Sequence, residues 1–280
     1  MMPKPGVYWT ESWNPVTGCT PCSPACDHCW AKATAARYEK SHSYSRPFSD
    51  IVLHPDRLDA PLHWVKPRVA AVTWMGDLFH EDVPDAFIGS VFSAMRGSHR
   101  PSDLLWVPSR HTFLVLTKRP ERMRQWLMTP KSTGGVLGQL YDWPFPNVWI
   151  GTTVWNQPSA DKNILILLDT PARHRWLSYE PALDSIEWEA GDWLEARNED
   201  GYRRSGIEWL VAGCESGVNR RPAPHSYFRR ARRACQRTGT KFYLKQLSQH
   251  EDGTGKVVKA PTLDGKQHLE LAWEAKHEVD

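Results

Sequence analysis

Four cysteines lie close together near the start of the chain, in the segment Cys19-Thr-Pro-Cys22-Ser-Pro-Ala-Cys26-Asp-His-Cys29. The chain has six cysteines in all, and no sequence feature indicates secretion, so these thiols are expected to be reduced. Thiolates are soft ligands, and reduced cysteines at such short spacing are typical of zinc or iron–sulfur sites. The sequence therefore predicts that this segment, the cysteine loop, binds a metal through Cys19, Cys22, Cys26 and Cys29.

The spacing of the four thiols is compatible with two kinds of metal site. Cys19-x2-Cys22 and Cys26-x2-Cys29 form two short pairs that could close around one zinc ion or one cluster with all four sulfurs. Cys22-x3-Cys26-x2-Cys29 resembles instead the spacing of radical S-adenosylmethionine enzymes, in which three thiolates hold a [4Fe-4S] cluster and one iron stays open for the cofactor. We favour the open cluster and keep the closed zinc site as the alternative.

The elements that must position this loop show a regular alternation of apolar runs and segments with helical periodicity. A first strand is predicted near residues 8–13, followed by strands at 69–73, 113–117, 148–153, 175–178, 207–212 and 241–245. Helices are predicted at 26–40, 84–95, 120–128, 157–168 and 224–238. Buried strands that alternate with helices are typical of parallel sheets. The predicted fold class is α/β: a parallel (β/α) barrel, full or partial, of about six to seven strands.

One barrel domain is predicted over residues 1–249, with insertions near 131–146 and 187–205. Residues 250–280 are predicted to form a C-terminal extension that packs on the barrel. The net charge of +3 and the lack of a long apolar run indicate a soluble, cytoplasmic protein with no membrane partner. Basic residues gather late in the chain, where Arg229, Arg232, Arg233 and Arg237 can share a helical face and so could contact phosphate.

In a (β/α) barrel the catalytic side chains follow the carboxyl ends of the strands. The residues that follow the predicted strands here include the cysteine loop, Gly76-Asp77, Lys118-Arg119, Thr153, Glu180, Cys214-Glu215-Ser216 and Lys245-Gln246. Lys118 or Arg119 could bind a carboxylate or a phosphate. His80, Glu81 and Asp82 are interpreted as capping a helix that begins near Pro84, because adjacent loop residues rarely converge on one ion.

Six ordered motifs between Trp9 and Gln246 carry a resemblance to a known family. They are WNPVTGC at 13–19, GDLFHEDVP at 76–84, LTKRP at 116–120, SYEP at 178–181, GCESG at 213–217 and FYLKQ at 242–246. The chain resembles a family of bacteriophages and prophages, mostly uncharacterised, that is related to radical S-adenosylmethionine enzymes and distantly to spore photoproduct lyase. That family's pattern, C-x6-C-x2-C, selects Cys19 with Cys26 and Cys29, whereas the wider superfamily pattern selects Cys22 as the third ligand.

The resemblance implies a radical-SAM or TIM-like barrel in which a [4Fe-4S] cluster and S-adenosyl-L-methionine generate a 5′-deoxyadenosyl radical. An external one-electron reductant of the flavodoxin or ferredoxin type would supply the electron. On this basis we expect one set of residues to bind the cofactor: Gly76, Asp77, Thr153, Glu180 and Ser216. We expect Lys118, Cys214 and Glu215 to take part in catalysis.

The resemblance also implies a substrate and a location. The expected reaction is the rearrangement or modification of a thymine-derived nucleobase in phage DNA, in the host cytoplasm if the protein is phage-encoded, with nucleic acid or a nucleotide as the partner. One alternative is a radical enzyme that acts on a small metabolite or a peptide. The other is a non-enzymatic protein in which four cysteines bind zinc and the arginines bind nucleic acid.

Overall fold

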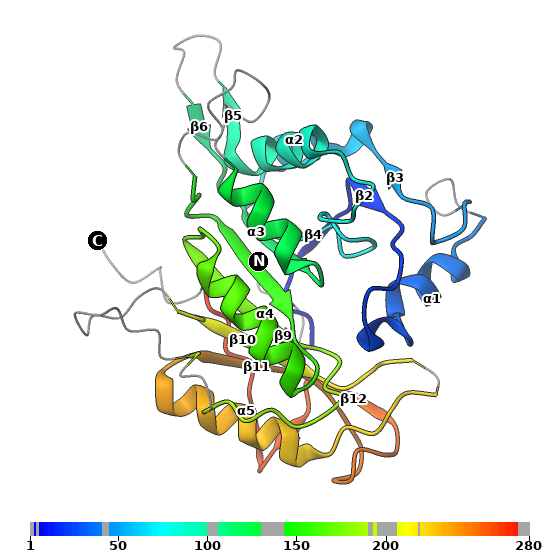
Figure 1. Ribbon diagram of the computed structural model, residues 1–280, viewed down its shortest axis with the longest axis vertical. Helices are drawn as coiled ribbons and strands as arrows, with labels where there is room; N and C mark the ends of the chain where they lie inside the picture. The colour runs from blue at the N-terminus through cyan, green and yellow to red at the C-terminus, as the bar shows by residue number, and fades with distance from the viewer. Residues whose placement is uncertain are drawn as a thin grey trace. The chain divides into compact units, whose positions relative to one another are not determined.

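The computed structural model describes residues 3, 6–40, 45–99, 106–129, 143–189, 193–194, 206–217 and 219–273 (Figure 1). The chain forms two compact units, which we describe separately. The first comprises Met1–Pro3, Trp9–Ile150 and Thr170–Arg173. The second comprises Lys4–Tyr8, Gly151–Asp169 and His174–Asp280.

The first unit holds the elements that surround the cysteine loop. In chain order they are β1 (Glu11–Trp13), β2 (Val16–Thr17), the 3₁₀ turn η1 (Pro24–Cys26), α1 (Trp30–Arg37), β3 (Val52–Leu53), the 3₁₀ turns η3 (Pro55–Arg57) and η4 (Ala60–His63), β4 (Val69–Val72), α2 (Asp85–Arg96), β5 (Gly97–His99), β6 (Trp106–Pro108), β7 (Thr112–Thr117) and α3 (Pro120–Met128). β4 pairs in parallel with both β1 and β7.

The strand β8 (Val148–Thr153) is divided between the units after Ile150. The second unit continues with α4 (Gln157–Asp169), β9 (His174–Tyr179), β10 (Trp209–Gly213), α5 (His225–Thr238), β11 (Lys241–Ser248), β12 (Val257–Lys259), β13 (Thr262–Leu263) and β14 (Lys266–Gln267). β10 pairs in parallel with both β9 and β11. Among the helices that the structure describes, none has the length and apolarity to cross a membrane.

The (β/α) barrel predicted from the sequence is wrong. Eight strands form one sheet in the order β1-β4-β7-β8-β9-β10-β11-β12, so that β1 and β12 are its edges within the described residues. β12 runs antiparallel to β11, and the described chain has no helix between β9 and β10. Apolar periodicity reports which residues are buried, not whether the first and last strands pair, so an open mixed sheet and a barrel give similar patterns.

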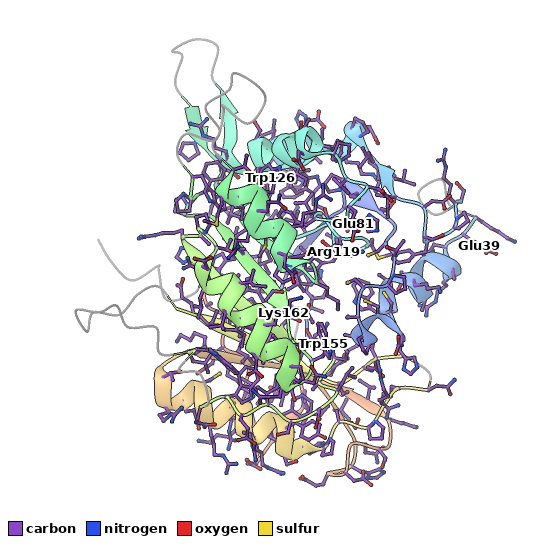
Figure 2. The ribbon with its side chains drawn as sticks, in the orientation of Figure 1. Glu39, Glu81, Arg119, Trp126, Trp155 and Lys162 are labelled. Atoms are coloured by element: carbon purple, nitrogen blue, oxygen red, sulfur yellow. The ribbon has the colours of Figure 1, made fainter. Side chains whose placement is uncertain are left out.

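The core of the first unit fixes the ends of β4 and β7. Helix α2 buries Ile88, Val91, Phe92 and Met95, which follow the i, i+3, i+4, i+7 spacing of an amphipathic helix. The ring of Phe92 lies 4.9 Å, centroid to centroid, from that of Trp126 on α3, which Figure 2 labels. Large buried rings pack α2 against α3. This packing fixes the positions of the polar residues that follow β4 and β7.

Aromatic side chains form the core of the second unit on one face of its strands. The Tyr8 ring lies 6.1 Å from Trp176, 5.2 Å from Trp209 and 5.3 Å from Tyr243. Gly151 makes room for this cluster, since a Cβ at that position would lie 2.4 Å from Nε1 of Trp176. Trp176 and Trp209 therefore serve packing in the core of this unit.

The segment after residue 249 packs against the strands of the second unit, to which it belongs, at several points. β12 pairs with Gln246–Ser248 of β11, and Trp209 Nε1 donates a hydrogen bond to the Glu270 carbonyl oxygen at 2.9 Å. The Trp273 ring meets Trp209 edge to face at 5.0 Å. Of the two predicted insertions, residues 131–142, 190–192 and 195–205 lie outside the described residues.

Gly18, the residue before the cysteine loop, has a conformation that alanine should not tolerate. Its φ is +89°, and an added Cβ would lie 2.0 Å from the Asp50 carbonyl oxygen. Gly265 has a similar φ of +78° but nothing within 4 Å, so it is a matched control. We expect Gly265→Ala to cost about 1 kcal/mol of unfolding free energy and Gly18→Ala at least ~2 kcal/mol more, because backbone must move. Urea denaturation measures both, and equal costs would contradict this prediction.

Candidate functional site

The cysteine loop leaves β2 and is anchored at its start by backbone contacts. The Gly18 N–H donates to the Met75 carbonyl at 3.0 Å, and the Cys19 N–H donates to the Phe48 carbonyl at 2.8 Å. A parallel bridge joins Gly18 to Gly76, which comes directly before Asp77. The loop thus lies next to the residues that follow β4. Cys22 is exposed, and the other three thiols are half-buried.

The thiols of Cys22 and Cys26 influence each other's titration: the pKa of Cys26 is lowered and that of Cys22 is raised. The 3₁₀ turn η1 ends at Cys26: Pro24 starts the turn, and the Cys26 N–H donates to the Ser23 carbonyl at 2.9 Å. Cys26 Sγ also lies 3.6 Å from Ser23 Oγ, and Cys22 Sγ lies 3.9 Å from the Lys118 carbonyl oxygen at the end of β7. The turn therefore brings one exposed and one half-buried sulfur together.

The two thiols of this pair differ in acidity. The hydrogen bond from Cys22 is the main cause that lowers the pKa of Cys26, to about 4, and the Lys118 charge lowers it further against the effect of burial. The pKa of Cys22 is raised, chiefly by its interaction with Cys26 and secondly by desolvation of its thiol. Hydrogen bonding to a thiolate favours the charged form. Cys26 is therefore the more acidic thiol of the two.

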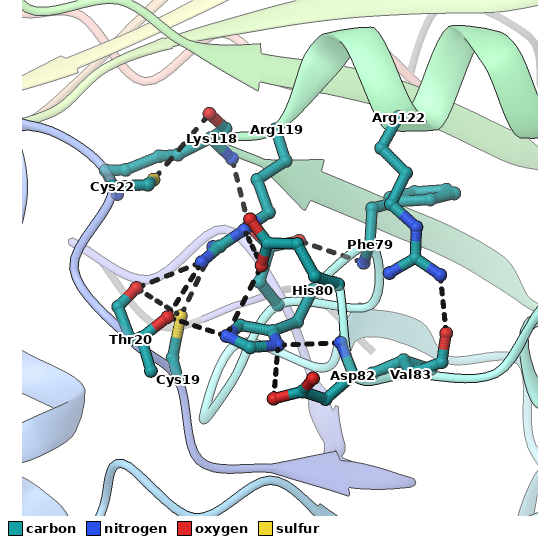
Figure 3. A network of polar contacts seen from close by, with 12 residues as sticks. Cys19, Thr20, Cys22, Phe79, His80, Asp82, Val83, Lys118, Arg119 and Arg122 are labelled. Carbon is teal, nitrogen blue, oxygen red and sulfur yellow. Dashed lines mark hydrogen bonds and ion pairs between the residues drawn. The ribbon is translucent and has the colours of Figure 1, made fainter.

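Cys19 is a different kind of cysteine. Burial and the nearby Asp77 carboxylate raise its pKa to about 11, even though the Arg119 guanidinium opposes this. Its Sγ accepts a hydrogen bond from Arg119 Nη1 at 3.5 Å and lies 3.4 Å from the Thr20 carbonyl oxygen (Figure 3). At neutral pH Cys19 is a protonated thiol held against Arg119.

A buried ion pair between Asp77 and Arg119 joins the ends of β4 and β7. Asp77 Oδ1 accepts hydrogen bonds from Thr117 Oγ1 at 2.7 Å and from the Phe79 N–H at 3.0 Å. Its Oδ2 accepts from the Lys118 N–H at 3.1 Å and lies 3.5 Å from Arg119 Nη1. Both side chains are less than 10% exposed, at 7% and 8%. Both carboxylate oxygens of Asp77 thus accept hydrogen bonds from protein donors.

Arg119 links Asp77 to the cysteine loop. Its Nε donates to Glu81 Oε2 at 3.0 Å, and its Nη2 donates to the carbonyl oxygen and the Oγ1 of Thr20 at 3.1 Å and 3.2 Å. Figure 2 labels Arg119 and Glu81 side by side, and Figure 3 shows the contacts to Thr20. Because a guanidinium has five fixed donors, one side chain can hold both the loop and the strand end.

His80 anchors the same residue of the loop. Its Nδ1 accepts from the Asp82 N–H at 3.1 Å, so the proton of the neutral ring sits on Nε2, which donates to Thr20 Oγ1 at 2.7 Å. Burial and the Arg119 charge lower the pKa of His80. The sequence interpretation of His80 as part of a helix cap missed this role. The only signal was its position three residues after Asp77.

The predicted cofactors, a [4Fe-4S] cluster with S-adenosyl-L-methionine, are wrong for this structure. Among the described residues, which include all four loop cysteines, no group of three or more His, Cys, Asp or Glu side chains is placed to hold a metal ion. Cys19 Sγ contacts Arg119, Cys22 Sγ contacts the Lys118 carbonyl oxygen, and Cys26 Sγ contacts Ser23 Oγ. Cys29 packs beside Ala31 and Ala35 of α1. Short spacing along the chain brings the four residues near one another but does not make their sulfurs converge.

Glu180, a predicted cofactor ligand in the second unit, is already bound by protein side chains. Its Oε1 lies 3.1 Å from Lys245 Nζ, and its Oε2 accepts from the Tyr8 hydroxyl at 3.3 Å. A Cβ on Gly213 would lie 2.7 Å from Oε1, so glycine is needed beside it. Burial and the Glu180 charge raise the pKa of Tyr8. Glu180 and Lys245 thus form a mostly buried ion pair in which the lysine neutralises the carboxylate charge.

The other predicted site residues of the second unit are Thr153, Cys214, Glu215 and Ser216, and they have different surroundings from Glu180. The buried Glu215 accepts from the backbone N–H of Arg221 at 2.7 Å and from its Nε at 3.1 Å. Cys214 is buried, which raises its thiol pKa, and Ser216 is exposed. Thr153 is fully buried, and its carbonyl accepts from Asn163 Nδ2 at 2.9 Å.

The predicted site residues that lie in the same unit as the four loop cysteines are Gly76, Asp77 and Lys118.

The arginine-rich helix α5 is largely neutralised by carboxylates. Arg229 contacts Glu251 and Asp264 at 2.7 Å each, and Arg232 contacts Asp264 at 2.9 Å. Arg230 pairs with Glu187, and Arg237 lies 3.9 Å from Glu189. Guanidinium groups that already bind carboxylates are poor phosphate ligands. Of the helical face predicted from the sequence, Arg229, Arg232 and Arg237 therefore contact carboxylates of the second unit.

Comparison with known proteins places the chain in a family but gives it no described activity. No curated protein and no solved structure matches the sequence. One family profile, described as "Protein of unknown function (DUF5131)", matches residues 4–272. Because the match spans nearly the whole sequence, the chain belongs to the DUF5131 family of proteins of unknown function.

Proposed function

We propose that the protein is a thiol–disulfide oxidoreductase that reduces a disulfide of its substrate in the cytoplasm. Cys26 would be the nucleophile, and Cys22 the thiol that releases the product. The observation that carries this proposal is the placement of two free cysteines, Cys22 and Cys26, at one 3₁₀ turn, with Cys22 exposed and each thiol shifting the pKa of the other. A nucleophilic thiolate with a second thiol beside it is what disulfide exchange requires.

The surroundings of the pair support the division of roles. A disulfide is attacked by a thiolate, and Cys26 is the thiolate because Cys22 and Lys118 stabilise its charge. Cys22 is exposed and can approach a mixed disulfide from the solvent side. Cys19 keeps its proton beside Asp77 and does not compete. The exchange thus begins at one sulfur.

The reaction balances with the two loop thiols as the electron source. Cys26 Sγ attacks one sulfur of the substrate R–S–S–R′, the S–S bond breaks, and R′–S⁻ leaves and takes up a proton. Cys22 then gives up its proton, and its Sγ attacks Cys26 Sγ, which releases R–S⁻. Two electrons pass to the substrate, and a Cys22–Cys26 disulfide remains. An external thiol reductant returns the pair to its dithiol form.

The network around Arg119 would position the loop during this reaction. Arg119 and His80 both hold Thr20, and Arg119 also holds the Cys19 sulfur. These contacts fix the first half of the loop while the turn with Cys22 and Cys26 stays accessible. The radical reaction, its nucleic-acid or nucleotide partner and its one-electron reductant, all implied by the resemblance, stay predictions; no contact described above supports them.

A single-turnover experiment tests the proposal. Reduced protein is mixed without oxygen with an excess of a synthetic peptide that contains one disulfide ring. We expect two peptide thiols to appear per protein molecule and two protein thiols to be lost, with mass spectrometry of the digest locating the new link between Cys22 and Cys26. A link that forms elsewhere, such as Cys19 to Cys29, or peptide that stays oxidised, would show that this pair is not the reductant.

A further inference from the structure

Helix α1 presents an exposed face that begins directly beside the cysteine loop. Cys29 is the N-cap residue of α1, and Trp30 is its first residue. One side of the helix is buried through Ala31 and Ala35, which pack near Met75. The side chain of Trp30 is 45% exposed, and Tyr38, next after the helix, is 54% exposed. Large exposed rings of this kind are common at sites that bind proteins.

The side of α1 that faces away from the buried alanines combines an aromatic ring with positive charge. At 100° per residue, Trp30, Ala33 and Arg37 follow one another at i, i+3 and i+7 along it. Lys32 and Arg37 are both exposed, and the helix has no acidic residue in its sequence WAKATAAR. We call the exposed residues of this side, Trp30, Ala33, Ala36 and Arg37, together with Tyr38 after the helix, the α1 face; Lys32 lies at its edge.

The charge around the α1 face favours one kind of partner. Lys32 and Arg37 lie within the helix, Lys40 follows it, and Lys118 lies beside Cys26 at the other end of the loop. Asp27 and Glu39 are the acidic residues at the two ends of this stretch. Residues 27–40 thus hold three cations and two anions, and Lys118 adds a positive charge near Cys26, whereas Asp77 and Glu81 are paired with Arg119. This excess of positive charge attracts a partner of negative charge.

We propose that the α1 face docks an acidic polypeptide that carries the disulfide which Cys26 reduces. This inference rests on the proposed function and names its substrate class. An apolar side chain of the partner would cover Trp30, and a carboxylate would pair with Arg37 about 10 Å away, two helical turns along. Nucleic acid would also suit a basic and aromatic surface, but it offers no disulfide to the thiol pair.

Two matched peptides test the docking surface. Both contain the same disulfide ring and one phenylalanine; one has glutamates beside the ring and the other has lysines. We expect the second-order rate of reduction to be about tenfold higher for the acidic peptide at low salt, and the difference to shrink as salt is added. Arg37→Glu should reverse the preference, and Trp30→Ala should slow both peptides several-fold.

The controls separate docking from chemistry. Lys66→Glu changes an exposed cation elsewhere in the first unit and should leave both rates unchanged. Alkylation of Cys26 by iodoacetamide, which needs no docking, should be the same in all three variants. Equal rates for the two peptides would overturn the docking proposal and leave the oxidoreductase intact, whereas failure to reduce either peptide would overturn the oxidoreductase. If a thymidine oligonucleotide suppresses reduction of both peptides equally, the face binds nucleic acid and the proposal is wrong.

Discussion

Replacing Cys26 with serine is expected to abolish disulfide reduction, leaving less than about one-thousandth of the wild-type rate, because the attacking thiolate is gone. Cys22→Ala should behave differently. Its first exchange step would proceed, but no second thiol would release the product, so a stable mixed disulfide of Cys26 and the substrate should accumulate. Mass spectrometry of the unreduced protein distinguishes these two outcomes. Cys214→Ala, at a buried thiol outside the loop, is the control and should keep full activity.

The pH dependence of Cys26 alkylation gives a second readout of the same pair. Since Cys22 is the main cause that lowers the Cys26 pKa, to about 4, wild-type Cys26 should react at a nearly constant rate from neutral pH down to mildly acid pH. In Cys22→Ala the Cys26 pKa should rise toward that of a free cysteine, about 8.5. Alkylation at pH 6 should then fall by about two orders of magnitude and recover as the pH rises. An unchanged profile would mean that Cys22 does not stabilise the thiolate.

Removing the Asp77 carboxylate is expected to have the largest effect on stability. Asp77→Ala leaves Thr117 Oγ1 and the N–H groups of Phe79 and Lys118 without their acceptor and weakens the charge balance of the buried Arg119. Breaking a buried ion pair from one side costs about 3–5 kcal/mol. The free energy of unfolding, measured in urea, should drop by about that amount.

The ion pair of Asp85 with Arg122 provides a matched control for Asp77. It joins an exposed carboxylate to a guanidinium at 3.2 Å, with Asp85 67% exposed. Asp85→Ala should cost less than about 1 kcal/mol, because solvent screens such pairs. Asp77→Asn keeps one acceptor oxygen and should fall between the two, which preserves the test if Asp77→Ala does not fold. Equal losses for Asp77→Ala and Asp85→Ala would show that the network adds no stability.

Much of the secondary structure follows from local sequence pattern. Runs such as 113–117 and 148–153 are strands, and 120–128 is a helix that starts at a proline, because burial and chain stiffness act over a few neighbouring residues. The closure of the sheet could not be predicted in this way. Whether β1 and β12 meet depends on strand twist and on connections summed over the whole chain.

The candidate site, too, was predicted from the sequence only in part. The sequence by itself determined that thiols gather between residues 19 and 29 and that Asp77 and Arg119 follow strands, since these are facts of spacing. Only the tertiary structure decided what the thiols do. A hydrogen bond needs atoms within a few ångströms and in the right direction. The turn at Pro24 places Cys26 Sγ beside Ser23 Oγ, while Arg119, a hundred residues along the chain, donates to Cys19 Sγ. Spacing therefore predicted thiolate ligands of one metal site, an open three-thiolate cluster being favoured over a four-thiolate zinc site, whereas the fold gives each of the four sulfurs different neighbours.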